Sequence, residues 1–417
     1  MRVWSYSKHS CVLALCLATL PPLKGYSVLT HEAIVDAIWL NAMLPVFKKR
    51  FPAASEADLR EAHSYAYGGC LIQDLGYYPF GNHLFTDLTH YIRSADFVQA
   101  LLDEATDINE LAFALGAVSH YHADLQGHSI AVNKSVAILF PELRAKFGTE
   151  VTYADSPGAH LETEFGFDVL QVARGRYAPN AYHDFIGFNV AKGSLDRAFS
   201  RTYGLSLKEV FPGLDLALGT FRFSVRSLIP NATRLAWELK KKEILELQPA
   251  ASRKAFLYNM KRSSYEMEWG HIYEKIGWRT RFFGVVARLI PRVGPFRSLG
   301  FRTPTQQTER LFEDSFDSAV ERDQETLRRM LISGDMRVPN RDLDTGRPVN
   351  PGEYELTDRT YDKLLVKLVA KHLDTVSPEL QTNILNFYGE RGTPDPHGVD
   401  AQIETLRLYQ PSVSKRP

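Results

Sequence analysis

The chain has 417 residues, and its 49 lysine and arginine side chains balance its 49 aspartate and glutamate side chains. A formal net charge of zero argues against a partner such as duplex nucleic acid, which usually requires a strongly basic face. It does not argue against a site in which metal ions handle a single phosphate group. The length fits one large domain or two smaller ones.

The first 25 residues are typical of a signal peptide. Two basic residues precede an apolar run over residues 11–20, and two prolines and Gly25 follow it. The run is too short to span a bilayer, so we expect a secreted or periplasmic protein that begins at Tyr26, although cleavage after Ala18 would also fit. Of the three cysteines only Cys70 would then remain. Without a disulfide, bound metal is one candidate for extra stabilisation.

The first half of the chain has a helical pattern and no alternating stretch typical of strands. Residues 31–44 are amphipathic, and residues 55–69 predict a second helix. Residues 107–128 predict a largely apolar central helix, and the sequence Asp155-Ser156-Pro157 predicts the start of another. We therefore expect an all-α helical bundle over residues 26–240.

After residue 240 the chain becomes more charged, and we interpret residues 241–417 as a helical C-terminal extension that supports or covers the bundle. Residues 309–332 carry an apolar stripe, and another helix is predicted from Thr357. The segment between them, residues 337–356, is rich in Pro, Gly, Asn and Asp, which predicts a long surface loop. Residues 282–296 are apolar with interspersed arginines, and they fit either a packed helix or a segment at a membrane surface.

Histidines and carboxylates recur at a spacing that suits metal binding. His120, Asp124 and His128 are four residues apart, so on a helix they project from one face. His160 and Glu164 repeat this step on another predicted helix. Imidazole and carboxylate are the ligands that suit Zn²⁺ where no thiolate is present.

A metal site competes here with structural interpretations. The stripe from His120 to His128 could be a solvated face or a buried hydrogen-bonded network. It lies in an apolar helix, however, where an unpaired charge is costly, and this favours metal. The pair formed by His160 and Glu164 could equally be an exposed ion pair. His122 lies on another face of its helix, and we interpret it as structural or as a support for the ligands.

The order of these motifs resembles that of the bacterial zinc-dependent phospholipase C family, which shares its fold with tri-zinc nucleases that cut single strands. The resemblance covers residues 26 to about 168, and no single block carries it alone. The blocks are YSVLTHEAI, GGCLIQDLG, FTDLTHY, SHYHADLQGH and AHLETEF.

The resemblance implies up to three zinc ions. The first would be held by Asp74, His90 and His120, with Asp124 shared as a bridge. The second would be held by His128, His160 and Glu164. The third would take His31, Asp124 and the terminal amino nitrogen and carbonyl of Tyr26.

Asp74 would also orient or deprotonate the attacking water. The step from Asp124 to His128 is shorter than the family commonly has. His83 competes with His90 for the position before the central helix.

The implied activity is that of an exported zinc-dependent phosphodiesterase. Phospholipase C activity on the glycerol-side phosphate ester of phospholipids is the first hypothesis, with peripheral membrane contact. A nuclease that acts on single strands is an alternative; it would need an aromatic platform for the bases, and the candidates are Tyr77, Tyr78, Phe80, Phe165 and Phe167. A non-catalytic protein with structural zinc is a further alternative, and a membrane-surface binding protein built on the C-terminal half is a fourth.

Overall fold

The computed structural model describes residues 28–173, 188–225, 241–246, 301–389 and 398–410. Within these ranges it contains helices and no strand, which confirms the predicted all-α fold. No helix in the described ranges is long and apolar enough to cross a membrane. Three predicted features lie outside the described residues: the signal peptide, Tyr26 and the segment 282–296. The chain before the predicted boundary at residue 240 is also outside them, from residue 226 on.

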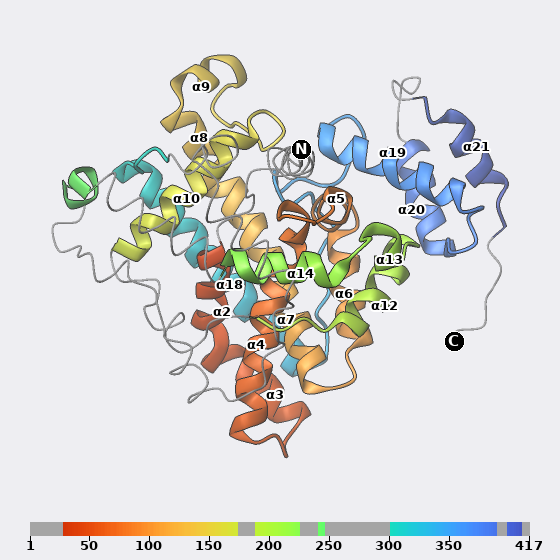
Figure 1. Cartoon of the computed structure of the whole chain (residues 1–417), viewed down its shortest axis with the longest axis horizontal. Coiled ribbons are helices and arrows are strands. Elements are labelled where there is room, and N and C mark those ends of the chain that lie inside the picture. The colour runs from red at the N-terminus through yellow and green to blue at the C-terminus, as the bar shows by residue number, and fades with distance from the viewer. Residues whose placement is uncertain (1–27, 174–187, 226–240, 247–300, 390–397, 411–417) are drawn as a thin grey trace, which may run out of the picture.

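The helices of the first half form a bundle (Figure 1). They are α2 (Val28–Ile38), η1 (Trp39–Met43), α3 (Leu44–Arg50), α4 (Glu56–Ile72), η2 (Gln73–Tyr77), α5 (His83–Tyr91), α6 (Ser94–Glu104), α7 (Ile108–Gln126), η3 (Gly127–Val132), α8 (Asn133–Leu139), α9 (Pro141–Phe147), α10 (Pro157–Ala173), α12 (Lys192–Tyr203), α13 (Leu207–Val210) and α14 (Leu214–Phe223). The second half contributes α18 (Gln306–Ser333), α19 (Glu355–Ala370), α20 (Pro378–Gly389) and α21 (Asp400–Leu408).

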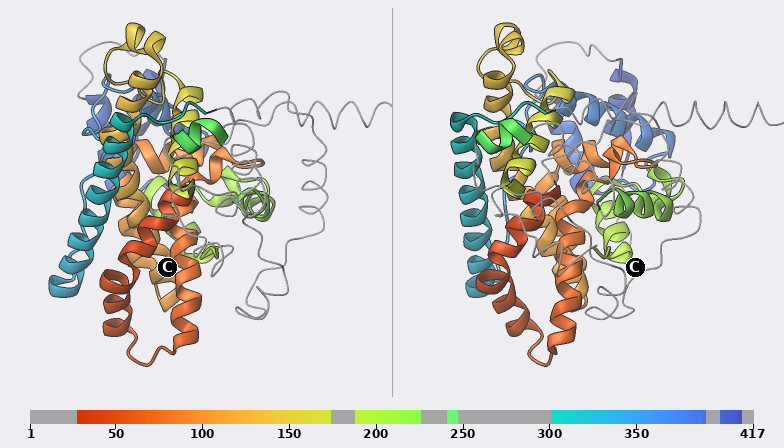
Figure 2. Two further views of the ribbon diagram at one scale, coloured as in Figure 1. Left: turned by 90° about the vertical axis from the view of Figure 1, so that its left-hand side faces the viewer. Right: turned by 60° about the vertical axis from the view of Figure 1, so that its left-hand side comes forward.

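Helix α7 is the central element of this bundle. Asp107 caps its N-terminus by accepting hydrogen bonds from the backbone N–H groups of Asn109 and Glu110. Every residue from 111 to 124 is buried, as the apolar sequence predicts. Helices α4, α6 and α18 pack against it, and the long α18 runs along the outside of the bundle beside α2 (Figure 2).

Helices α4 and α7 approach each other at glycines. A Cβ atom on Gly69 would lie 1.9 Å from the carbonyl oxygen of Phe113, and one on Gly116 would lie 2.0 Å from that of Ala66. Only glycine fits at such a crossing, because a side chain would collide with the facing backbone. The close approach brings the end of α4, and η2 after it, next to the polar residues of α7.

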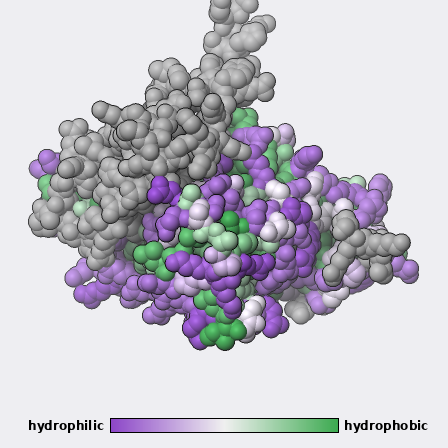
Figure 3. All heavy atoms as spheres, turned by 90° about the horizontal axis from the view of Figure 1, so that it is seen from below, coloured by the Kyte–Doolittle hydropathy of each residue, from purple (hydrophilic) through white to green (hydrophobic). Residues whose placement is uncertain are grey.

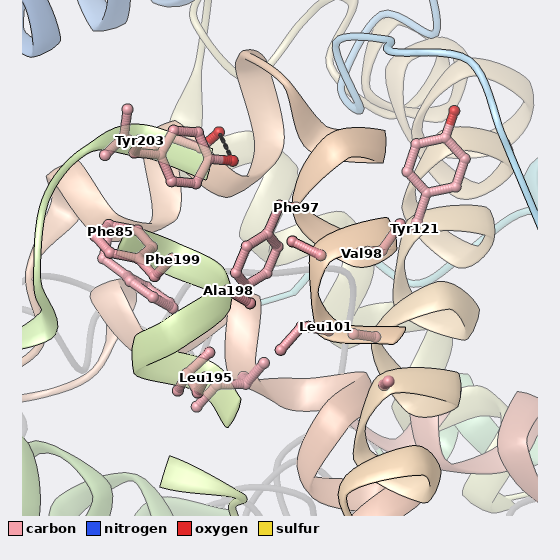
Figure 4. Packing of buried hydrophobic residues seen from close by; sticks show 14 of the residues in the cluster. Phe85, Phe97, Val98, Leu101, Tyr121, Leu195, Ala198, Phe199 and Tyr203 are labelled. Atoms are coloured by element: carbon pink, nitrogen blue, oxygen red, sulfur yellow. Dashed lines mark hydrogen bonds between the residues drawn. The ribbon is translucent and has the colours of Figure 1, made fainter. Parts of the chain in front are cut away.

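An aromatic cluster fixes α5, the helix that carries His90. Phe97 of α6 and Phe199 and Tyr203 of α12 pack together beside Phe85 of α5 (Figure 4). The Tyr203 hydroxyl lies 3.0 Å from the Leu88 carbonyl oxygen and 3.1 Å from that of Ile92. The last turn of α5 is therefore held by packing on one side and by a hydrogen-bonding side chain at its end.

The prediction of a surface loop over residues 337–356 is wrong for its central part. Asp342, Leu343 and Asp344 are at most 3 % exposed. The polar residues of the segment bond to the protein instead of to water: the Asn340 side-chain oxygen accepts the backbone N–H groups that begin α6, from Ala95 at 2.9 Å and Asp96 at 3.1 Å. Residues 340–344 thereby join the bundle, and Leu343 belongs to the same hydrophobic core as α4 and α7.

The surface shown in Figure 3 is mostly hydrophilic, with smaller apolar areas. Five large apolar side chains are exposed in the described residues, four of them in four different helices and one in the turn before α5: Leu40, Ile332, Val366 and Leu408, and Phe80. Single exposed apolar side chains are common on folded proteins and do not by themselves indicate a docking surface.

Candidate metal centre

Four of the predicted site residues meet where η2, α5 and α7 converge. His90 Nε2 lies 3.4 Å from Asp74 Oδ1, 3.0 Å from Asp124 Oδ2 and 3.1 Å from His120 Nε2. His120 Nε2 lies 3.2 Å from Asp124 Oδ2. Zinc bonds of about 2.0–2.1 Å in tetrahedral geometry place neighbouring donor atoms about 3.3 Å apart. The four side chains therefore have the spacing of donors around one zinc ion.

Backbone carbonyl oxygens orient the imidazole rings. His90 Nδ1 lies 2.9 Å from the Thr86 carbonyl oxygen, and His120 Nδ1 lies 2.9 Å from that of Cys70. In His160 the bonded atom is Nε2, at 2.6 Å from the Val151 carbonyl oxygen. In each ring the other nitrogen faces the carboxylates. A metal-binding imidazole typically donates its second N–H in this way, which fixes the ring and its tautomer.

Asp124 connects this group to two further histidines. Its Oδ2 faces His90 and His120, whereas its Oδ1 lies 3.3 Å from His31 Nε2 and 3.8 Å from His128 Nε2. His31 comes from α2, and its ring stacks on His120 with centroids 4.5 Å apart. Burial alone would raise the pKa of Asp124, but His120 and the other imidazoles hold that pKa well below its usual value. Asp124 is thus an ionised carboxylate placed to be shared.

A second group forms around His128 and His160. Glu164 Oε1 lies 3.9 Å from His128 Nδ1 and 3.8 Å from His160 Nδ1. His128 follows α7 in the wider π-helical turn η3, and its ring reaches Asp124 with one nitrogen and this second group with the other. Such turns are frequent at functional sites.

The sequence did not predict Asp344, which lies in this second group. Asp344 Oδ1 is 3.4 Å from His128 Nδ1, and His128, His160 and Asp344 can together hold a metal ion. No spacing pattern in the sequence links Asp344 to His160 and Glu164, which lie far earlier in the chain on α10. Its neighbours Asp342, Thr345 and Gly346 are typical turn residues, so the segment resembled a turn.

The third predicted site is described only in part. His31 and Asp124 lie together with His120 in a group able to hold a metal ion. Tyr26, which would supply the terminal amino nitrogen, lies outside the described residues. Its role in this site stays a prediction.

The donor atoms of these groups fit a cation. Asp74 Oδ1, Asp124 Oδ1, His160 Nδ1 and Asp344 Oδ1 are buried and have no hydrogen-bond partner within the described residues. Unpaired buried polar atoms are costly, and a bound metal ion removes that cost. Burial alone would lower the pKa of His90, but the neighbouring carboxylates of Asp124 and Asp74 raise it to about 10. The carboxylates therefore attract positive charge strongly.

The other three histidines of the first half that the structure describes, His63, His83 and His122, lie apart from these groups. His122 is on another side of α7, where its Nε2 lies 3.1 Å from Thr326 Oγ1 of α18, and burial lowers its pKa to about 3. His63 stacks on Trp39. His83 is exposed at the start of α5, so that His90, not His83, joins Asp74.

The groups line a cleft together with three tyrosines, Tyr77, Tyr91 and Tyr153. Tyr77 is the one residue of the predicted aromatic platform that lines the cleft in the described part of the chain. Tyr78 packs on Phe221, and Phe167 packs on Phe312 in the core. The other two candidates, Phe80 and Phe165, are also absent from the cleft lining.

Comparison with known proteins gives one match. Residues 30–213 match the family model described as zinc dependent phospholipase C. The search of curated proteins and the search of solved structures found no match. The matched range contains every predicted ligand except Tyr26, and the geometry of those ligands agrees with the name of the family. Residues 30–213 of this chain therefore belong to the zinc-dependent phospholipase C family.

Proposed function

We propose that this chain is a zinc-dependent phosphodiesterase that hydrolyses the glycerol-side phosphate ester of phospholipids. The observation that carries the proposal is the shared position of Asp124 between buried imidazole–carboxylate groups at a cleft. Two or more metal ions held close together are the usual arrangement for cleaving phosphodiesters. The family name supports a phospholipid as the substrate.

Zinc would be held at three places, if each group is filled. The first place would use Asp74, His90, His120 and Asp124, and the second His128, His160 and Glu164. The third would use His31, Asp124 and the mature N-terminus. When bound, zinc supplies a Lewis acid that polarises phosphoryl oxygens and lowers the pKa of water.

We propose that Asp74 acts on the attacking water. It lies at the wall of the cleft, and its Oδ1 is buried without a hydrogen-bond partner in the described residues. A carboxylate in this position can orient a water molecule and accept its proton. We therefore assign general-base catalysis to Asp74.

The tyrosines of the cleft can donate hydrogen bonds to a phosphate group. Burial raises the pKa of both Tyr77 and Tyr91 well above its usual value. Their phenols thus keep their protons at neutral pH. A neutral phenol is a hydrogen-bond donor, as a phosphate oxygen requires.

We also propose export of the protein, on the basis of its N-terminal 25 residues.

The test is release of phosphocholine from phosphatidylcholine micelles by the purified chain. We expect release that a chelator abolishes and added zinc restores. Asp74→Asn should lose the activity. Asp103→Asn should keep it, because Asp103 lies on the outside of α6 in an exposed ion pair with Arg201 of α12. Single-stranded DNA is assayed in parallel. Cleavage of DNA without phosphocholine release would favour the nuclease, and zinc-loaded protein inactive on both substrates would favour structural zinc.

A further inference from the structure

The second metal group contains a carboxylate from outside the family domain. The family match ends at residue 213, whereas Asp344 lies between α18 and α19. We propose that Asp344 Oδ1 is a ligand of the second zinc ion, together with His128, His160 and Glu164. This inference rests on the zinc centre proposed above and adds a donor that the family motifs do not contain.

The hydrogen bonds of Asp344 divide its two oxygens between different tasks. Oδ2 accepts the Tyr153 backbone N–H at 2.9 Å and the Tyr354 hydroxyl. Oδ1 is buried, has no hydrogen-bond partner in the described residues, and lies 3.4 Å from His128 Nδ1. One oxygen is therefore fixed by the protein, and the other faces two imidazoles with nothing else to bind.

The backbone around Asp344 is anchored on α8 and on α5, the helix that carries His90. The Asn133 side chain donates to the Asp344 carbonyl oxygen at 2.8 Å, and Leu343 N–H donates to the His90 carbonyl oxygen at 3.0 Å. Gly346 ends the turn at φ +74°, and a Cβ atom there would lie 3.1 Å from Ser129 Cβ. The carboxylate is thus held in position before any metal binds, as an effective ligand must be.

Four protein donors would change the character of the second zinc ion. A zinc site with three protein ligands keeps an open position for water, whereas four ligands close it. With Asp344 bound, the second zinc would have four protein donors and would tie residues 340–346 to η3 and α10.

The key variant is Asp344→Asn, which has nearly the same shape. The Tyr153 N–H and the Tyr354 hydroxyl both require an acceptor, so the new amide oxygen would take the Oδ2 position. Its NH₂ group would then face the imidazoles, and an amide nitrogen is no zinc ligand. The matched control is Asp342→Asn. Asp342 is buried in the same turn, where it accepts the backbone N–H groups of Asp344 and Thr345. It belongs to none of the metal groups found among the described residues.

Zinc per chain is measured after dialysis against a chelator, and zinc affinity by competition with a chromophoric chelator. We expect Asp344→Asn to lose one zinc ion relative to the wild type, or to bind it at least 100-fold more weakly, and Asp342→Asn to keep it. Equal zinc content and affinities within threefold in Asp344→Asn and the wild type would overturn the inference. A wild type without zinc would instead overturn the proposed function. If Asp344→Asn does not fold, zinc-edge diffraction from wild-type crystals decides: a zinc ion bonded to Asp344 is expected, and one that binds His128 and His160 without it refutes the proposal.

Discussion

Replacing Gly116 by alanine should separate the two helices that position the metal centre. The new Cβ atom would lie 2.0 Å from the Ala66 carbonyl oxygen and 2.9 Å from the Cys70 backbone nitrogen. Both atoms belong to the backbone of α4 and cannot rotate away. Because ordinary contacts of this kind are about 3.4 Å, the helices must move apart by more than about 1 Å, which is large for a close-packed interior.

Two costs follow from that movement. Overpacking of a core commonly lowers the free energy of unfolding by about 1–3 kcal/mol, and a collision with backbone belongs at the upper end of this range. Alanine has a better helix propensity than glycine, which raises the free energy of unfolding by about 1 kcal/mol. We therefore expect a net loss of about 2 kcal/mol in the free energy of unfolding. The movement also lengthens the 2.9 Å contact between His120 Nδ1 and the Cys70 carbonyl oxygen. Loss of such a support typically weakens metal binding about 10–100-fold.

Urea unfolding of the zinc-loaded protein and zinc competition measure the two effects. Gly158→Ala is the control, since a Cβ atom at this helical position would meet nothing within 4 Å. It should leave zinc affinity unchanged and alter stability by less than about 1 kcal/mol. If Gly116→Ala behaves like Gly158→Ala in both measurements, the close crossing of α4 and α7 does not position His120 as described.

Three further predictions concern single side chains. Asp74→Asn should keep most of the bound zinc and lower kcat about 10²–10⁴-fold, and equal losses of zinc and activity would show that Asp74 is mainly a ligand. Asp107→Ala should cost about 1 kcal/mol in urea unfolding, because it removes the N-cap of α7. Burial raises the pKa of Asp323 to about 8 from an ordinary value of 3.8. The folded state therefore binds a proton there that the unfolded state releases, and stability falls as pH rises between these values, at about 1.4 kcal/mol per pH unit. Between pH 6 and 8, the free energy of unfolding of Asp323→Asn, measured in urea, should therefore rise relative to that of the wild type by this slope. If the two free energies change with pH in parallel, the assignment is contradicted.

The sequence predicted those parts of the fold and site that depend on local patterns. The apolar run over residues 107–128 corresponds to α7 and the start of η3, and residues 309–332 lie within α18. The step of four residues brings His120 and Asp124 to one face because helix geometry alone determines that relation. The expected helix over residues 31–44 is interrupted, since α2 ends at Ile38 and the π-helical turn η1 follows.

What the sequence did not predict depends on tertiary contacts. Asp344 reaches the second group because Asn340 caps α6 and Leu343 bonds to His90, and neither contact leaves a periodic signal. The same polar residues predicted a solvated loop, because a side chain that bonds to a helix end has the same chemistry as one that bonds to water. The choice of His90 over His83 needed a family motif, since both precede the central helix.

The most direct test of the central claim is the zinc content of Asp124→Ala beside that of the wild type. Asp124 Oδ2 faces the first group and Oδ1 faces His31, so in the proposed centre one side chain would serve two metal positions. We predict that the wild type binds up to three zinc ions per chain by elemental analysis. Provided that circular dichroism shows an intact helical fold, Asp124→Ala should bind two fewer. A variant that retains the zinc content of the wild type, or loses one ion alone, would contradict a centre built around a shared Asp124.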